Sequence, residues 1–125
     1  MPTADLSVVE VKAFVPAKDF ERSMAFYQAL GFTRASVDDG IAYFHHGHAS
    51  FLLQDFYVRE HADNFLMHLL VEDVEAWHAM AKAVARQFEV RIGEPEDQPW
   101  AMRDFVLFDP SGVLWRIGQN LPKAE

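Results

Sequence analysis

The chain has 125 residues, half of them hydrophobic and including eleven Phe, which suffices for one domain with its own core and excludes a disordered chain. A formal net charge of −8 argues against nucleic acid as a partner, because phosphate contacts need clustered Lys and Arg. The absence of Cys excludes disulfides and a cysteine nucleophile, and the lack of a visible signal peptide or membrane-length apolar run predicts a cytoplasmic protein with no membrane partner.

The first half of the chain predicts one strand, one helix and three further strands. A strand is expected over Val8–Val15, where apolar and β-branched residues dominate, and Pro16 ends it. A helix begins at its capping residue Asp19, carries apolar residues at helical spacing, and closes at Gly31. Turn signals then separate three short strands, which are expected at Phe32–Val37, Ile41–His46 and Ala49–Gln54.

The second half repeats this order. A strand over Phe65–Val71 precedes a helix that is capped by Asp73, and a strand near Phe88–Ile92 follows it. After a loop through Pro95 and Pro99, the last two strands are expected as a hairpin of Arg103–Phe108 and Val113–Gly118, joined by a turn at residues 109–112. The motif at residues 19–21 matches that at residues 73–75, which places the two halves in register.

Two such halves predict a single α+β domain over residues 1–125. Its two tandem β-α-β-β-β modules, about residues 7–56 and 65–119, form a curved mixed sheet. The helices pack on one face of this sheet, and the other is a concave ligand-binding face. A single ferredoxin-like sandwich is the alternative, but it needs fewer strands than these turns supply.

Several stretches resemble the vicinal-oxygen-chelate superfamily, which contains glyoxalases, dioxygenases and antibiotic resistance proteins, and are most similar to its bleomycin-resistance branch. These stretches are the helix opening at residues 19–27, residues 63–66, residues 97–100, residues 103–105 and residues 109–112. Ala101 and Met102 stand where a single Gly is expected after the Pro-Trp pair. The resemblance implies a homodimer, with Val8, Val9, Phe105 and Trp115 as expected contributors to its interface.

The resemblance also implies where metal-dependent relatives hold their ion. The four ligand positions fall on Lys12, on Leu52 or Gln54, on Leu66 and on Arg116. Lys and Arg offer no lone pair at neutral pH, so we predict no metal and no cofactor. The alternative metal site is the run from His45 to His48 with His68, but Gly47 is typical of a turn that would leave these histidines solvated.

Strand alternation and the resemblance together predict the ligand-binding residues of the concave face. They are Lys12, Phe44, His46, Gln54, His68, Trp100, Met102 and Arg116. We expect Trp100 to act as an aromatic lid over a planar ligand, with core or dimer packing as the alternative. For Lys12 and Arg116 the alternative is an ion pair with Glu10 or another carboxylate.

Two functions stay open because no catalytic residue can be assigned. The chain has no Gly-x-Ser-x-Gly elbow and no glycine-rich phosphate loop. The first function is metal-independent binding of a small molecule, with bleomycin-like antibiotics as the first candidates. The alternative is a small lyase, isomerase or dioxygenase-like enzyme that uses Glu10, His46 or His68 as a base. The acidic net charge suits a cationic ligand, whereas the two inward cations favour an anionic one.

Overall fold

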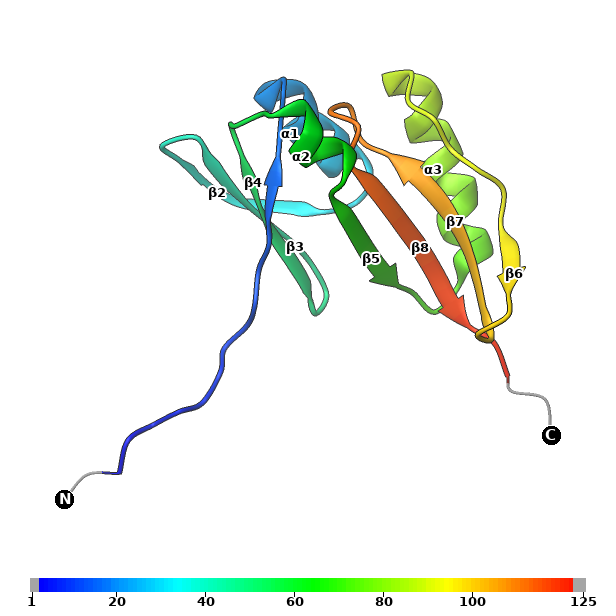
Figure 1. Cartoon of the computed structure of the whole chain (residues 1–125), viewed down its shortest axis with the longest axis horizontal. Coiled ribbons are helices and arrows are strands. Elements are labelled where there is room, and N and C mark those ends of the chain that lie inside the picture. The colour runs from blue at the N-terminus through cyan, green and yellow to red at the C-terminus, as the bar shows by residue number, and fades with distance from the viewer. Residues whose placement is uncertain (1–2, 123–125) are drawn as a thin grey trace.

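The computed structural model describes residues 3–122 and contains two β-sheets with helices packed on one side of them (Figure 1). The elements, in chain order, are β1 (Phe14–Pro16), α1 (Phe20–Ala29), β2 (Thr33–Asp38), β3 (Ile41–His46), β4 (Ala49–Gln54), α2 (Arg59–Asp63), β5 (Leu66–Leu70), α3 (Val74–Phe88), β6 (Glu96–Gln98), β7 (Met102–Phe108) and β8 (Leu114–Asn120). We call β1–β4 with α1 the first module and β5–β8 with α3 the second module. No helix among the described residues is long and apolar enough to cross a membrane.

The two modules share one topology. The first sheet has the strand order β1-β4-β3-β2 and the second has β5-β8-β7-β6. In each sheet the first strand of the module runs parallel to the last, and the other neighbours are antiparallel. Each module is therefore a β-α-β-β-β unit, which confirms the α+β fold expected from the repeated motif. The two four-stranded sheets lie side by side and are hydrogen-bonded within themselves.

Both predicted helix starts are confirmed. The Asp19 side chain accepts a hydrogen bond from the backbone N–H of Arg22 at 3.1 Å, and Asp73 accepts one from Ala76 at 3.0 Å. Each carboxylate satisfies a backbone donor that would otherwise lack a partner at a helix end. Since the caps occupy equivalent places in the two modules, they set the start of α1 and of α3 alike.

The core is an aromatic cluster at the junction of the two modules. The ring of Tyr27 lies 4.8 Å from that of Phe51, 5.9 Å from that of Phe44 and 5.6 Å from that of Trp115, measured between centroids. All four side chains are fully or almost fully buried. Burial of aromatic rings is the largest single source of packing energy in a domain of this size, so this cluster holds the modules together.

The expected first strand is wrong over most of its length. Only Phe14–Pro16 forms a strand beside β4. The Ala13 carbonyl still accepts a hydrogen bond from Leu52, and Glu10 contacts Tyr43 and Ser50, whereas residues 3–8 extend away from the body of the molecule (Figure 1). The sequence pattern of a strand is present, but β4 begins at Ala49, and no other strand of the described residues lies beside residues 3–11. A segment with strand propensity needs a neighbour to complete its hydrogen bonds.

The expected strand near Phe88–Ile92 is also wrong. Helix α3 continues to Phe88, whose ring packs 5.5 Å from that of Phe26 on α1. Glu89 then ends the helix with a left-handed backbone, φ 57°. Ile92 makes only an isolated bridge to Leu107, and the fourth strand of the module is β6, within the segment expected to be a loop. The short helix α2 was likewise not predicted.

Candidate functional site

Each sheet turns one face to the helices and leaves the other uncovered. We call the uncovered surfaces the open faces. The open face of the first module carries Lys12, Phe14, Tyr43, Ser50, Leu52 and Gln54, and that of the second carries Leu66, His68, Leu70, Met102, Asp104 and Arg116. Several apolar side chains stay half-exposed there, and Leu66 has 57% of its surface exposed. Exposed apolar surface of this kind is typical of a site that binds a ligand or another protein chain.

A polar cluster lies at the centre of the second open face. One guanidinium nitrogen of Arg116 lies 3.3 Å from both carboxylate oxygens of Asp104. Asp104 is only 2% exposed and also accepts a hydrogen bond from the Gln98 amide at 3.0 Å. Beside this pair, the Nε2 atom of His68 lies 3.2 Å from the sulfur of Met102. The charge of Arg116 is therefore balanced within the chain, because a buried carboxylate needs a paired cation.

The cation of the first open face is balanced in the same way. Lys12 Nζ lies 2.6 Å from Glu10, whose carboxylate also accepts hydrogen bonds from Ser50 at 2.7 Å and Tyr43 at 3.2 Å. The hydrogen bonds from Lys12 and then from Ser50 lower the pKa of Glu10 to about 2. The ion pair that sequence analysis offered as the alternative for Lys12 is the arrangement found.

A cleft of about 410 Å³ opens between the modules and reaches from Glu10 and Ser50 to His68. Glu10 and Ser50 line one side of it, and His68 lies on the other. Its walls also include the edges of Phe51 and Trp115 from the aromatic core. The volume and the mixture of aromatic and polar atoms suit a small molecule or one part of a larger ligand.

Five of the expected ligand-binding residues lie on the open faces, and their contact with a ligand stays a prediction. Lys12 and Gln54 lie on the first face, and His68, Met102 and Arg116 lie together on the second. Trp100 is at the tip of the turn between β6 and β7, 62% exposed, and two residues before Met102. Within residues 3–122 it stacks on no other ring, and its role as a lid stays a prediction.

The placement expected for Phe44 and His46 is wrong. Phe44 is 0% exposed and stacks on Phe51 in the core, at 5.5 Å between centroids. His46 shares its strand parity and reaches the helix side, where its ring lies 5.5 Å from that of Trp77. Phe105 and Trp115, expected at a dimer interface, are core residues too. Alternation along β3 instead places Tyr43 on the open face.

Sequence reasoning missed three polar side chains of the open faces, namely Tyr43, Ser50 and Asp104. The sequence held a signal for Asp104. Asp104 and Val106 lie on the same face of β7, and Val106 is paired with Arg116 of β8, so an acidic and a basic residue share that face. A signal also existed for Tyr43, since the hydroxyl group of Tyr favours a partly solvated face over the core position that Phe44 takes. Ser50 carries no comparable signal.

The residues present do not fit the metal of metal-dependent relatives. The four positions hold Lys12, Leu52 or Gln54, Leu66 and Arg116, so at most the Gln54 amide oxygen could be a ligand, and the two cations are already bound to carboxylates. Neither a leucine nor a charged Lys or Arg can donate a lone pair to a metal. Within the described residues 3–122, no three His, Asp or Glu side chains gather in a way that could hold an ion.

Comparison with known proteins agrees with this fold over almost the whole chain. Residues 8–117 match the family model of the Glyoxalase/Bleomycin resistance protein/Dioxygenase superfamily. The chain is 31% identical over 114 residues to a bleomycin resistance protein of Klebsiella pneumoniae, which covers 85% of this chain and 88% of the relative.

Solved structures give the same result. A bleomycin-binding protein in complex with bleomycin is similar with a TM-score of 0.78 and 28% identity, covering 90% of this chain and 99% of that one. A bleomycin resistance determinant encoded on the transposon Tn5 also gives 0.78, with 26% identity over 90% and 98% of the two chains. A lactoylglutathione lyase of Agrobacterium tumefaciens, at 16% identity and a TM-score of 0.65 over 90% and 94%, shares the fold alone.

Proposed function

The chain belongs to the glyoxalase/bleomycin resistance protein/dioxygenase superfamily, and from that premise we propose that it binds and sequesters a bleomycin-class antibiotic in the cytoplasm without turning it over. The observation that carries this proposal is the pairing of Lys12 and Arg116 with carboxylates at the positions where metal-dependent relatives hold their ion. The site has lost the means of metal chemistry and retains an apolar surface with oriented polar groups, which is what binding requires.

The ion pairs also support a cationic ligand. Taken alone, the two cations would repel such a ligand, whereas Glu10 and Asp104 neutralise them in place. The net charge of −8 then attracts cations toward the molecule. The two cations on the strands alone favoured an anionic ligand, whereas the neutralised surface suits a positively charged antibiotic.

The enzymatic alternative has weaker support from the same contacts. A carboxylate with a pKa of about 2, as in Glu10, is a poor base near neutral pH. His46 lies on the helix side, away from the open faces. His68 faces the sulfur of Met102, and no carboxylate orients its ring among the described residues. None of the three candidates therefore combines a suitable pKa, a position on the open faces and an orienting carboxylate, which a general base commonly has.

We further propose that the binding unit is a homodimer. Leu6, Val8, Val9 and Val11 are almost completely exposed on the extended N-terminal arm, residues 3–13, and Val9 reaches 96%. Among residues 3–122, strand β5 pairs only with β8 and leaves one edge free. An aliphatic arm and a free sheet edge on one molecule are typical of segments that a second copy covers.

Isothermal titration with bleomycin tests the binding function. If Trp100 stacks on the ligand, Trp100→Ala weakens binding by roughly 1–3 kcal/mol, about ten- to a hundred-fold. Gln28→Ala, on the exposed side of α1, serves as the control and leaves the affinity unchanged. Bleomycin recovered unaltered, as judged by mass spectrometry, distinguishes sequestration from turnover. Absence of heat with the wild-type protein would contradict the proposal.

The role of the central ion pair needs a paired substitution. Arg116→Met alone leaves Asp104 buried without its cation and destabilises the fold. The double variant Arg116→Met with Asp104→Asn removes both charges. We expect it to retain bleomycin binding and to lose affinity for small aromatic acids. A double variant that loses bleomycin affinity to the same extent as Trp100→Ala would mean that the pair itself contacts the antibiotic.

A further inference from the structure

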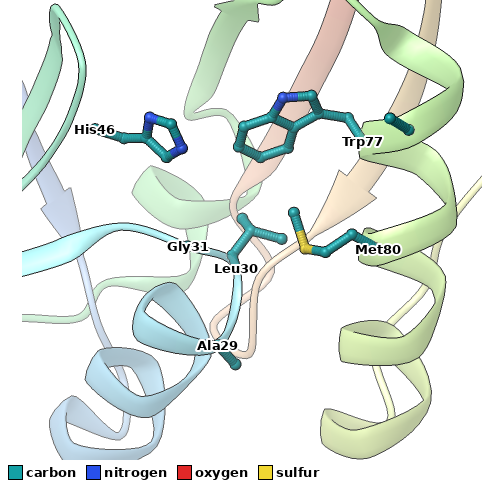
Figure 2. Close-up of a pocket in the computed structure, with 7 residues that line it drawn as sticks. Ala29, Leu30, Gly31, His46, Trp77 and Met80 are labelled. Carbon is teal, nitrogen blue, oxygen red and sulfur yellow. The ribbon is translucent and has the colours of Figure 1, made fainter.

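A second hollow lies on the helix side of the molecule, where the end of α1 faces α3 (Figure 2). It has a volume of about 280 Å³ and is lined by Ala29, Leu30, Gly31, His46, Ala76, Trp77 and Met80. None of these residues belongs to the open faces. The hollow is therefore separate from the site proposed above for the antibiotic.

This hollow continues into a neighbouring one of about 560 Å³. The two share His46, Ala76 and Trp77, so we treat them together as the helix-side cleft. The second part passes Leu69, Leu70 and Val71 and reaches Glu72 and Asp73. It adjoins the 410 Å³ cleft, with which it shares His48, Ala49 and Leu69, whereas the part around Trp77 and Met80 shares no residue with that cleft. The combined space is in the range of pockets that accept drug-sized molecules.

The walls of the cleft are aromatic and polarizable. His46 and Trp77 point toward each other from β3 and α3, and Met80 lies beside the indole (Figure 2). Neither the indole N–H nor the imidazole nitrogens make a hydrogen bond to another described residue. A ring face and free polar atoms are thus available to a planar guest, and an indole is the best natural partner for a cation above its ring.

The charges of the cleft favour a cation. Glu72 and Asp73 are the charged residues among those that line it, and no Lys or Arg is among them. One oxygen of Asp73 accepts the backbone N–H of Ala76, and Glu72 forms no ion pair within the described residues. A positive group beside Trp77 would gain attraction from both carboxylates, whereas an anion would be repelled.

We propose that the helix-side cleft is a second binding site, specific for a small planar aromatic cation. It does not depend on antibiotic binding by the open faces. The N-terminal arm of a second copy is a poorer occupant, because its aliphatic residues are accompanied by Asp5 and Glu10, which would face Glu72 and Asp73. The arm also carries no ring to stack on Trp77.

Three acridines of nearly equal shape test the charge preference by titration at about pH 7.5. They are 9-aminoacridine, which is a cation, acridine, which is neutral, and acridine-9-carboxylate, an anion. We expect 9-aminoacridine to bind about tenfold more tightly than acridine and the carboxylate to bind least. Glu72→Gln should weaken the cation several-fold and leave acridine unchanged. Equal affinity for all three probes would overturn the proposal.

Matched substitutions on α3 locate the site. Ala76→Leu fills the cleft and should lower the affinity for 9-aminoacridine at least about tenfold. Ala79→Leu, on the exposed surface of the same helix, makes the same chemical change outside the cleft and should have no effect. Both positions are exposed, so neither variant disturbs the core, and circular dichroism melting verifies this.

The remaining outcomes also decide the question. If Trp100→Ala rather than Ala76→Leu abolishes 9-aminoacridine binding, the probe occupies the open faces and the proposal is wrong. If Ala76→Leu converts a dimer into a monomer, the cleft holds a second chain and the proposal is wrong as well. Loss of bleomycin binding in a control titration would count against the antibiotic function and would leave this inference intact.

Discussion

In the turn before β7, Ala101 has a left-handed backbone conformation that is unfavourable for a residue with a Cβ atom. Ala101 has φ 62° and donates its backbone N–H to the carbonyl of Gln98 at 3.1 Å. A left-handed residue after a tight turn is ordinarily Gly, and a Cβ atom there costs about 1–2 kcal/mol. This is the position where the resemblance to bleomycin resistance proteins led us to expect Gly. The turn keeps its shape with Ala and holds Trp100 at its tip under strain.

Ala101→Gly should therefore raise the free energy of unfolding by about 0.5–1 kcal/mol, because relief of the strain exceeds the added flexibility of the unfolded chain. Urea denaturation measures the change. The control is Ala83→Gly, at an exposed position inside α3, which should lower stability by about 1 kcal/mol. Two changes of the same sign would show that Ala101 is not strained.

At the scale of the elements, most of the N-terminal arm and one edge of strand β5 have no neighbouring strand within the described part of the chain. The arm has the composition of a strand but pairs with β4 only from Phe14 onward. Strand β5 is apolar on both sides and has one free edge. Edges of this kind aggregate unless a specific partner covers them. We propose that a second copy of the same chain covers the arm and the free edge of β5.

Val9→Asp tests whether the arm holds two copies together. Since Val9 is exposed within its own chain, the substitution should leave the fold unchanged, while a charge at a covered position disfavours association. Light scattering at micromolar concentration should show a dimer for the wild type and a monomer for the variant. Thr3→Asp, nearer the end of the same arm, adds the same charge and should remain dimeric. A monomeric wild-type protein would contradict the dimer.

At the scale of the whole molecule, a buried chain of hydrogen bonds joins the two modules. Trp115 of β8 donates its indole N–H to the Tyr27 hydroxyl at 2.9 Å, and this hydroxyl donates to Asp109 at 2.6 Å. Tyr27 belongs to α1 of the first module, and the other two lie in the second. Burial raises the pKa of Asp109 to about 6, against the lowering effect of Tyr27 and of backbone N–H groups.

Asp109 should make the stability of the molecule depend on pH. The folded chain holds this proton up to about pH 6 and the unfolded chain releases it near 3.8, so stability falls as pH rises between these values. The full difference corresponds to about 3 kcal/mol, of which about 2 kcal/mol should be lost between about pH 4.5 and pH 7.5.

Asp109→Asn removes this titration, and the difference between the two proteins isolates it from other groups. Urea unfolding at several pH values should show wild-type stability decreasing relative to the variant as pH rises. The lowered pKa of Glu10 acts in the opposite direction, with stability lost as pH falls from 4.5 toward about 2. The measurements therefore stay above about pH 4.5. A constant difference at all pH values would rule out a raised pKa for Asp109.

Much of the fold could be predicted because its signals are local. The caps at Asp19 and Asp73 set both long helices, and the turn at residues 109–112 set the last hairpin. The strands β3 and β4 have the predicted bounds. The strand expected near Phe88–Ile92 failed because α3 gains more by packing Phe88 against Phe26 than the local β propensity provides.

The candidate site was predictable in part, for a related reason. Alternation along a strand tells which residues share a face, and it placed His68 and Arg116 together correctly. It does not tell which face meets the helices. On β3 we expected Phe44 on the open face, but in the structure Phe44 faces the helices and Tyr43 lies on the open face. Nor could the sequence predict the ion pair between Asp104 and Arg116, because these residues lie on different strands and meet only in the folded sheet.

The amino-acid sequence by itself determined the repeated module, the helix starts and the presence of Lys12 and Arg116 where a metal would need lone pairs. These are properties of neighbouring residues or of residue chemistry. Only the tertiary structure decided which strand faces are buried, that Glu10 and Asp104 neutralise the two cations, and that most of the arm has no neighbouring strand among the described residues. Such features depend on pairings between segments distant in sequence, whose free energy comes from burial and long-range contacts that local patterns do not encode.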